Sequence, residues 1–233
     1  MTTLPKYERY KDSGVEWLGE IPEEWEELPF LSLFHESNER NGKNIVGDML
    51  SVSGYRGVET KEYESDAQKR TETQLADYRV VRKGQLAVNT MWLNYTGLGV
   101  SELEGHMSPA YRAYNIDDNL NNRYAHYLLR CHPYVQGYTG LMQGIRPNSL
   151  QIKSNDFKRI PVLVPPKPEQ DRIVRETNDA IRAKFTEAGK RGGEAIRDTF
   201  HLSRTFGTLR IGLLDVIGIS RLLRRNKKTT YAR

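Results

Sequence analysis

Asp48, Glu59 and Lys61 come nearest to a catalytic pattern in this sequence. An acid followed by an acid-x-Lys triplet is the order in which many nucleases hold a metal ion at a phosphate, and carboxylate oxygens are good ligands for Mg²⁺. The same order also arises by chance in a chain with 28% charged residues, most of which are solvated surface groups. A metal-dependent nuclease is therefore kept as an alternative, beside an ordinary charged surface.

Other metal-binding and catalytic patterns are missing from the sequence. The five histidines show no HExxH or Cys-His ligand spacing, and Cys131 is the single cysteine, which also excludes an internal disulfide. There is no GxGxxG, no GxxxxGK[ST] and no NPPY-type tetrapeptide of amino-methyltransferases. We therefore expect no metal, no cofactor and no enzymatic activity of the chain's own.

The positive net charge of +5 belongs to the C-terminal tail. Residues 197–233 hold nine Lys or Arg and two acids, a net +7, so residues 1–196, with 26 basic and 28 acidic groups, carry −2. A near-neutral body is compatible with nucleic-acid binding, because what matters is whether cations gather on one face. The first residues lack a secretory apolar segment and no window reaches about 18 uninterrupted apolar residues, so we expect a cytoplasmic protein without a membrane span.

The 233 residues are expected to form one α+β domain with an appendage. Residues 21–34 predict a short strand and a short helix, with Trp25 and Leu28 as core residues. Short runs rich in β-branched or aromatic residues predict further strands at 49–53, 78–81, 85–90 and 110–116.

Residues 121–135, NNRYAHYLLRCHPYV, predict the clearest helix of this domain. Asn121 is a typical N-cap, and Pro133 is expected to end or kink the helix. The residues from 137 to 154 hold three glycines among polar side chains and predict a loop. Loops of this composition often carry binding groups on a rigid scaffold.

The stretch from 159 to 174, RIPVLVPPKPEQDRIV, predicts a strand, an abrupt stop and a new helix. Pro165 and Pro166 cannot continue a strand ladder, whereas the third proline suits the first turn of a helix. Apolar residues then recur at a spacing of three and four. We therefore predict a long helix at 167–190 that ends at the glycines from Gly189 onward.

Three segments share the pattern of one known family. Residues 10–26, YKDSGVEWLGEIPEEWE, match an opening of the form Lys-x-Ser-Gly-x-x-Trp-Leu-Gly-x-Ile-Pro-x-x-Trp. Residues 106–116, HMSPAYRAYNI, match a Ser-Pro-x-Tyr strand, and residues 160–173 match an Ile-Pro, Pro-Pro, Glu-Gln, Ile signature. The chain therefore resembles the DNA specificity subunits of type I restriction-modification systems.

This resemblance implies a non-catalytic subunit that reads double-stranded DNA and directs a methylation subunit and a restriction subunit to their target. It implies one globular target recognition domain at residues 1–166, followed by a long coiled-coil-type spacer helix at 167–190 on which those subunits dock. Residues 191–233 would form an atypical basic tail. The strand and prolines before the helix would fix the angle at which the helix leaves the domain.

The chain departs from the family pattern in its length and in its tail. A full member has two recognition domains and two spacers, so this chain would read one half of a bipartite target. The tail suggests a sequence altered or truncated relative to the family, as by a reading-frame change. A homodimer of half-subunits is a further expectation, through an exposed stripe on the spacer for packing against another helix. The stripe consists of Ile173, Thr177, Ile181 and Phe185.

Three segments offer the side chains that base reading requires, namely hydrogen-bonding groups on loops and cations for phosphates. They are residues 53–61, 89–97 and 143–153. Arg suits guanine, and Asn or Gln suits adenine. Trp92 and Tyr95 have an alternative interpretation as packing aromatics. The candidate DNA-binding residues are Tyr55, Arg56, Lys61, Asn89, Asn94, Tyr95, Gln143, Arg146, Asn148 and Lys153.

The tail supports a third hypothesis, a membrane-surface or partner-binding protein. Its apolar residues would form a stripe beside a group of arginines, as in helices that lie on membranes. Gly212 and Gly218 argue against a firm helix there. The residues concerned are Leu209, Leu213, Val216, Ile217 and Leu223, with Arg221, Arg224 and Arg225.

Overall fold

The computed structural model describes residues 7–54, 56–63, 70–144 and 150–190, so the basic tail lies outside the described residues. The chain divides into two compact units. We call Leu28–Arg130 with Val135–Val162 the sheet unit, and Met1–Glu27 with Cys131–Tyr134 and Leu163–Arg233 the helical unit. Strand β3 (Glu26–Pro29) pairs with β14 (Pro161–Val164).

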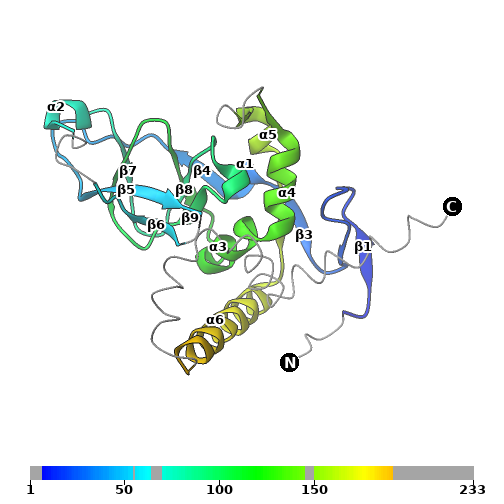
Figure 1. Cartoon of the computed structure of the whole chain (residues 1–233). Helices are drawn as coiled ribbons and strands as arrows, with labels where there is room; N and C mark the ends of the chain where they lie inside the picture. Colours follow the sequence, from blue (N-terminus) through cyan, green and yellow to red (C-terminus); the bar gives the residue numbers. More distant parts are fainter. Residues whose placement is uncertain (1–6, 55, 64–69, 145–149, 191–233) are drawn as a thin grey trace. The chain divides into compact units, whose positions relative to one another are not determined.

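Two four-stranded sheets form the sheet unit (Figure 1). One has the order β6-β5-β10-β7 and the other β4-β11-β8-β9, and only the β5–β10 pair is parallel among these neighbours. The core between them combines Leu50, Val81 and Met107 of the first sheet with Ala87 and Ala113 of the second. The strands are β4 (Phe34–Ser37), β5 (Asp48–Ser53), β6 (Gly57–Thr60), β7 (Arg79–Val81), β8 (Leu86–Val88), β9 (Leu98–Val100), β10 (Gly105–Met107) and β11 (Arg112–Ile116).

Short helices and an aromatic cluster complete the sheet unit. Helix α3 (Asn122–Arg130) packs along β9. Phe30 lies 5.1 Å from Tyr114 and 4.6 Å from Phe157 between ring centroids, so the cluster joins a helix, a sheet and a second helix. The remaining elements are α1 (Phe30–Leu33), α2 (Glu72–Leu75), η2 (Leu93–Tyr95), α4 (His132–Leu141), β12 (Met142–Gln143), β13 (Gln151–Ile152) and α5 (Ser154–Lys158).

The four strands predicted after residue 48 are confirmed as β5, β7, β8 and β11. Asn121 is the predicted N-cap, since its Oδ1 accepts the Arg123 N–H at 2.8 Å. The single helix predicted at 121–135 is wrong, because α3 ends at Arg130 and α4 begins at His132. Pro133 lies in the first turn of α4, where its missing N–H is tolerated. The predicted loop at 137–154 is wrong in part for the same reason, since α4 continues to Leu141.

Two core residues predicted near the N-terminus differ in burial. Trp25 is buried as predicted, whereas Leu28 is only half-buried. The reason is that Leu28 lies on β3, one strand of a two-stranded sheet, and such a narrow sheet covers its residues incompletely.

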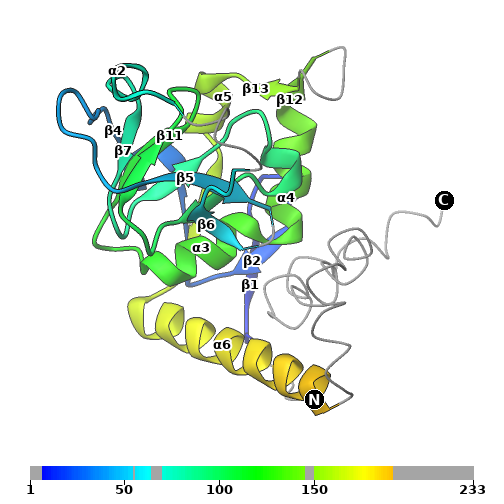
Figure 2. The same ribbon diagram turned by 60° about the vertical axis from the view of Figure 1, so that its left-hand side comes forward.

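The helical unit combines an N-terminal hairpin with the long helix α6 (Lys167–Lys190), a single helix of 24 residues (Figure 2). The hairpin pairs β1 (Tyr10–Asp12) with β2 (Glu20–Pro22) in antiparallel register. Gln170 is fully buried, and its Nε2 donates to the Pro165 oxygen at 2.9 Å, which closes the corner between strand and helix. Gly189 lies within α6 and does not end it, since one helical glycine costs only about 1 kcal/mol.

Candidate nucleic-acid interface

Two of the three predicted reading segments, 53–61 and 89–97, lie next to each other in the sheet unit. The first contains the turn of the β5–β6 hairpin, and the second connects β8 to β9. Tyr111 lies between the second segment and β5, because its hydroxyl hydrogen-bonds with the Asn89 side chain and with the backbone of Val52, the residue just before the first segment. Burial of this phenol raises its pKa, and the two hydrogen bonds oppose that rise. The two segments therefore lie close together.

Arg130, the last residue of α3, is buried and joins the same two segments. Its Nη1 donates to the Leu98 oxygen and, at 3.2 Å, to the Thr96 oxygen, while its Nη2 donates to the Gly54 oxygen at 3.0 Å. A guanidinium presents five N–H donors in a fixed plane, so one side chain can hold several carbonyls in place. We call this arrangement the Arg130 clasp.

His126 lies one turn before Arg130 and packs against the same strands. Its Nδ1 accepts the Val100 N–H at 3.2 Å. A Cβ added at Gly57 would lie 2.9 Å from the His126 Cε1, and the φ of +88° also favours glycine there. Burial, followed by the charges of Arg130 and Arg123, lowers the pKa of His126 to about 3. The imidazole is therefore neutral near pH 7, as its role as acceptor requires.

The second segment is a tightly hydrogen-bonded turn that exposes two aromatic rings. The Asn89 N–H donates to the Gly97 oxygen at 2.7 Å, and the Gly97 N–H donates to the Trp92 oxygen at 2.8 Å. Leu93 is fully buried and anchors the turn. Trp92 is 56% exposed and Tyr95 is 48% exposed. They are therefore not core residues, because the anchoring is done by Leu93, but their interpretation as loop-packing aromatics stands, since the two rings contact each other.

The predicted polar residues of these segments differ in their exposure. Arg56 and Lys61 are exposed, and the Arg56 Nε forms an ion pair with the Glu59 Oε2 at 3.1 Å. Such exposed pairs contribute little free energy, so an anionic ligand can compete for the Arg56 guanidinium. Asn94 is half-buried, and its Oδ1 is shielded from solvent without a hydrogen-bond partner among the described residues.

The third predicted segment lies on a separate hairpin, β12–β13. Gln143 is exposed on β12, and Lys153 is exposed just before α5. Tyr55, Arg146 and Asn148 lie outside the described residues, so their DNA contacts stay predictions.

The residues of the nuclease pattern are not assembled into a metal site. In the β5–β6 ladder Glu59 lies opposite Ser51, and Asp48 is three residues further along β5. At about 3.3 Å per residue this separates the two acids by roughly 10 Å along the strands. Within the described part of the chain, no three His, Cys, Asp or Glu side chains are grouped so that they could hold a metal ion.

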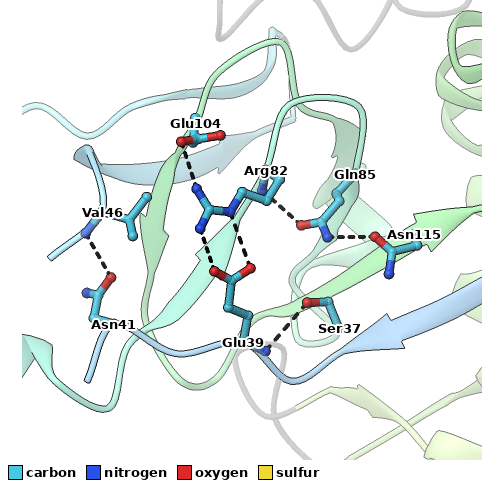
Figure 3. A network of polar contacts seen from close by, with 8 residues as sticks. All are labelled: Ser37, Glu39, Asn41, Val46, Arg82, Gln85, Glu104 and Asn115. Atoms are coloured by element: carbon cyan, nitrogen blue, oxygen red, sulfur yellow. Dashed lines mark hydrogen bonds and ion pairs between the residues drawn. The ribbon is translucent and has the colours of Figure 1, made fainter. Parts of the chain in front are cut away.

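A second arginine, Arg82, ties together strand ends on the surface of the sheet unit (Figure 3). Its Nη2 contacts the Glu39 Oε1 at 2.5 Å and its Nη1 contacts the Glu104 Oε1 at 2.8 Å. Beside it, the Gln85 Nε2 donates to the Asn115 Oδ1 at 2.8 Å. Glu39, Arg82, Gln85 and Asn115 border a polar hollow of about 450 Å³. Because Arg82 already faces two carboxylates, its charge is balanced locally.

Glu169 joins the first turn of α6 to the N-terminal segment of the helical unit. Its Oε2 accepts the Trp25 indole N–H at 3.2 Å, and its Oε1 accepts the Tyr7 hydroxyl and the Arg172 Nη2–H. Burial, followed by the hydrogen bond to Glu169, raises the pKa of Tyr7. The first and third segments that carry the family resemblance therefore meet at one carboxylate, which we call the Glu169 node.

Two residues of the stripe on α6 that we expected to be exposed are buried, so the prediction is wrong at these positions. Ile173 and Thr177 are buried within this chain, and Ile181 is half-buried. The side chain of Phe185 lies outside the described residues. The first part of the stripe therefore serves the packing of the chain itself, which sequence periodicity cannot distinguish from packing against a partner.

Among the described residues, no helix, α6 included, is long and apolar enough to cross a membrane.

No family model and no curated protein matches this sequence. Three solved chains are similar in structure. One comes from a study of complex assembly and conformational transition of the type I R-M system, with 14% identity, 89% of this chain and 48% of that chain covered, and a TM-score of 0.47. The second is the HsdS subunit of Thermoanaerobacter tengcongensis, with 13% identity, 89% and 47% covered, and a TM-score of 0.46. The third is a type I restriction-modification S subunit of M. genitalium, with 15% identity, 68% and 39% covered, and a TM-score of 0.46.

The chain spans about half or less of the length of these three solved chains. Their names belong to the family that the sequence motifs resemble.

Proposed function

We propose that this chain is a DNA specificity subunit of a type I restriction-modification system and reads one half of a bipartite target. The observation that carries this proposal is the Arg130 clasp, which joins the 53–61 and 89–97 segments. Together they present a cation, amides and aromatic rings on a β scaffold, as base reading requires. The sequence motifs and the Glu169 node between two of them support the same function.

In this proposal, α6 docks the methylation and restriction subunits. The Glu169 node and the buried Gln170 fix the first turn of α6, so the rest of the helix leaves the corner in a defined direction. Because Ile173 and Thr177 are buried, the docking surface would begin near Ile181. Sedimentation of the full chain, with Ile181→Asp as control, tests whether the same surface pairs two half-length chains. A monomer unchanged by this substitution, alone and with a methylation subunit, would contradict the docking role.

The proposed subunit performs no chemistry on DNA by itself. Asp48 and Glu59 lie apart in the β5–β6 ladder, and the Glu59 carboxylate is paired with Arg56. Incubation of the purified chain with duplex DNA and Mg²⁺ should give no cleavage. Cleavage that disappears in Glu59→Ala would favour the nuclease alternative instead.

Selection from random DNA tests the reading function. The full chain is incubated with duplexes that have a randomised centre, and the bound duplexes are amplified and sequenced over several rounds. We expect one short motif to emerge, with an affinity at least about 10³-fold above that for non-specific DNA. Failure of any motif to emerge would show that the proposed function is wrong.

A further inference from the structure

The turn at 89–97 gathers exposed apolar side chains. Met91, Trp92 and Tyr95 are three of the seven large apolar residues that are exposed in the described chain. Isolated exposed apolar residues are ordinary, but a group of aromatic side chains in a rigid loop is typical of a binding surface. Tyr95 is among the candidate DNA-binding residues predicted from the sequence, whereas Trp92 is not.

The backbone that carries these rings is tightly constrained. Thr96 has φ +62°, a backbone conformation that a β-branched residue rarely adopts, and its carbonyl is bonded to Arg130. A Cβ added at Gly97 would lie 2.7 Å from the Trp92 oxygen, so the chain closes tightly on itself there. A loop whose backbone is already fixed loses little conformational entropy on binding.

The geometry of the two rings limits what they can bind. Their centroids are 5.5 Å apart and their planes are inclined by 53°. A nucleobase cannot enter between rings that already contact each other, so the pair cannot sandwich an unstacked base. It offers an apolar edge instead. In the major groove of duplex DNA, the apolar group on a base edge is the thymine methyl.

We propose that Trp92, supported by Tyr95, contacts a thymine methyl group and makes the chain specific for an A·T pair at one position of its site. Leu93 and Arg130 are positioning residues, because they hold the turn and do not touch DNA. This inference rests on the proposed DNA-reading function and names one specificity determinant within it.

A thymine-to-uracil scan tests the inference. The probe is the duplex selected by the wild-type chain, with each thymine replaced in turn by deoxyuridine, which lacks only the methyl group. We expect the wild type to bind about tenfold more weakly at one position. Trp92→Ala should bind the thymine duplex about tenfold more weakly and lose nothing further on uracil substitution at that position.

Leu31→Ala is the matched control, because Leu31 is 50% exposed in the same unit and lies outside the turn. It should bind like the wild type and keep the methyl dependence. Trp92→Phe, which preserves an apolar ring, should fold normally and keep part of that dependence, so the test holds even if Trp92→Ala is unstable.

The outcomes separate the inference from the proposed function. The inference would be overturned if both Trp92 variants kept the full wild-type loss of affinity on uracil substitution. It would also be overturned if both bound the thymine duplex as tightly as Leu31→Ala does. In either case, specific binding by the wild type would still support the proposed function. If the wild type selects no duplex at all, the proposed function fails and the thymine contact fails with it.

Discussion

Arg130 and Arg82 both donate hydrogen bonds to oxygens of the sheet unit, but one is buried and the other is open to water. Arg130 is 7% exposed and bonds three backbone carbonyls, whereas the Arg82 side chain is 40% exposed and bonds the carboxylates of Glu39 and Glu104. If Arg82 is removed, water can replace it at both carboxylates. Carbonyls buried beside Arg130 have no such substitute, so the same residue type should differ greatly in its contribution to stability.

The largest effect is expected for Arg130→Met, which keeps the apolar stem and removes the donors. Loss of the charge-assisted hydrogen bonds should reduce the free energy of unfolding by about 3 to 5 kcal/mol. Urea denaturation of the full chain measures this. A loss below about 1 kcal/mol would mean that the carbonyls find other partners and that the clasp is dispensable.

A smaller effect is expected where the strands approach α3. Gly57→Ala must place a Cβ 2.9 Å from the His126 Cε1 at φ +88°, and we expect a loss of about 3 kcal/mol from strain and overpacking together. Gly42→Ala is the matched control, since Gly42 has φ +58° with nothing within 4 Å of an added Cβ. This substitution should reduce the free energy of unfolding by about 1 kcal/mol, from backbone strain alone. Equal losses in the same denaturation assay would show that the contact with His126 has no energetic weight.

His126, which is buried beside Arg130, should make the free energy of unfolding depend on pH. The pKa of His126 is lowered to about 3 in the folded chain, so between that value and its ordinary pKa of 6.5 the unfolded chain binds the extra proton. Stability should therefore fall as pH falls through this range, by about 2 kcal/mol from pH 7 to pH 5. His126→Gln, which keeps an acceptor for the Val100 N–H, should have a flatter profile. If the wild type and His126→Gln lost stability equally as pH falls, other titrating groups would be responsible for the pH dependence.

The smallest effect is expected for Arg82→Gln, because Arg82 is the solvent-exposed one of the two arginines. Its ion pairs are exposed and screened by salt, so the shift in the urea midpoint should be smaller than for any variant above and should vanish at about 1 M NaCl. A loss as large as that of Arg130→Met would show that exposure does not distinguish the two arginines.

Local sequence patterns predicted four of the eight strands in the two four-stranded sheets and missed β4, β6, β9 and β10. β5, β7, β8 and β11 are short runs with turn residues on both sides, so each is specified by its own neighbourhood. The break between α3 and α4 falls at Cys131 alone, and no glycine or cap residue marks it. Pro133 was informative, but it marked the start of a helix where an end was predicted.

The candidate interface was predicted as separate segments and not as a surface. The bonds of Arg130 join positions 32 to 76 residues apart in the sequence, and no local pattern reveals such contacts. One signal was present, since His126 and Arg130 lie four residues apart on a helix whose other buried residues are mostly apolar. The burial of Thr177 and Ile173 was not predicted, because an apolar stripe in the sequence looks the same whether the chain itself or a partner covers it.

Hydrogen–deuterium exchange of the full chain, with and without the duplex that it selects, tests most directly whether the clasped segments are the DNA-reading surface. The account predicts that DNA slows amide exchange in 53–61 and 89–97 together, with little change along α6. Protection of one of these segments without the other, or protection confined to the β12–β13 hairpin or to α6, would contradict it.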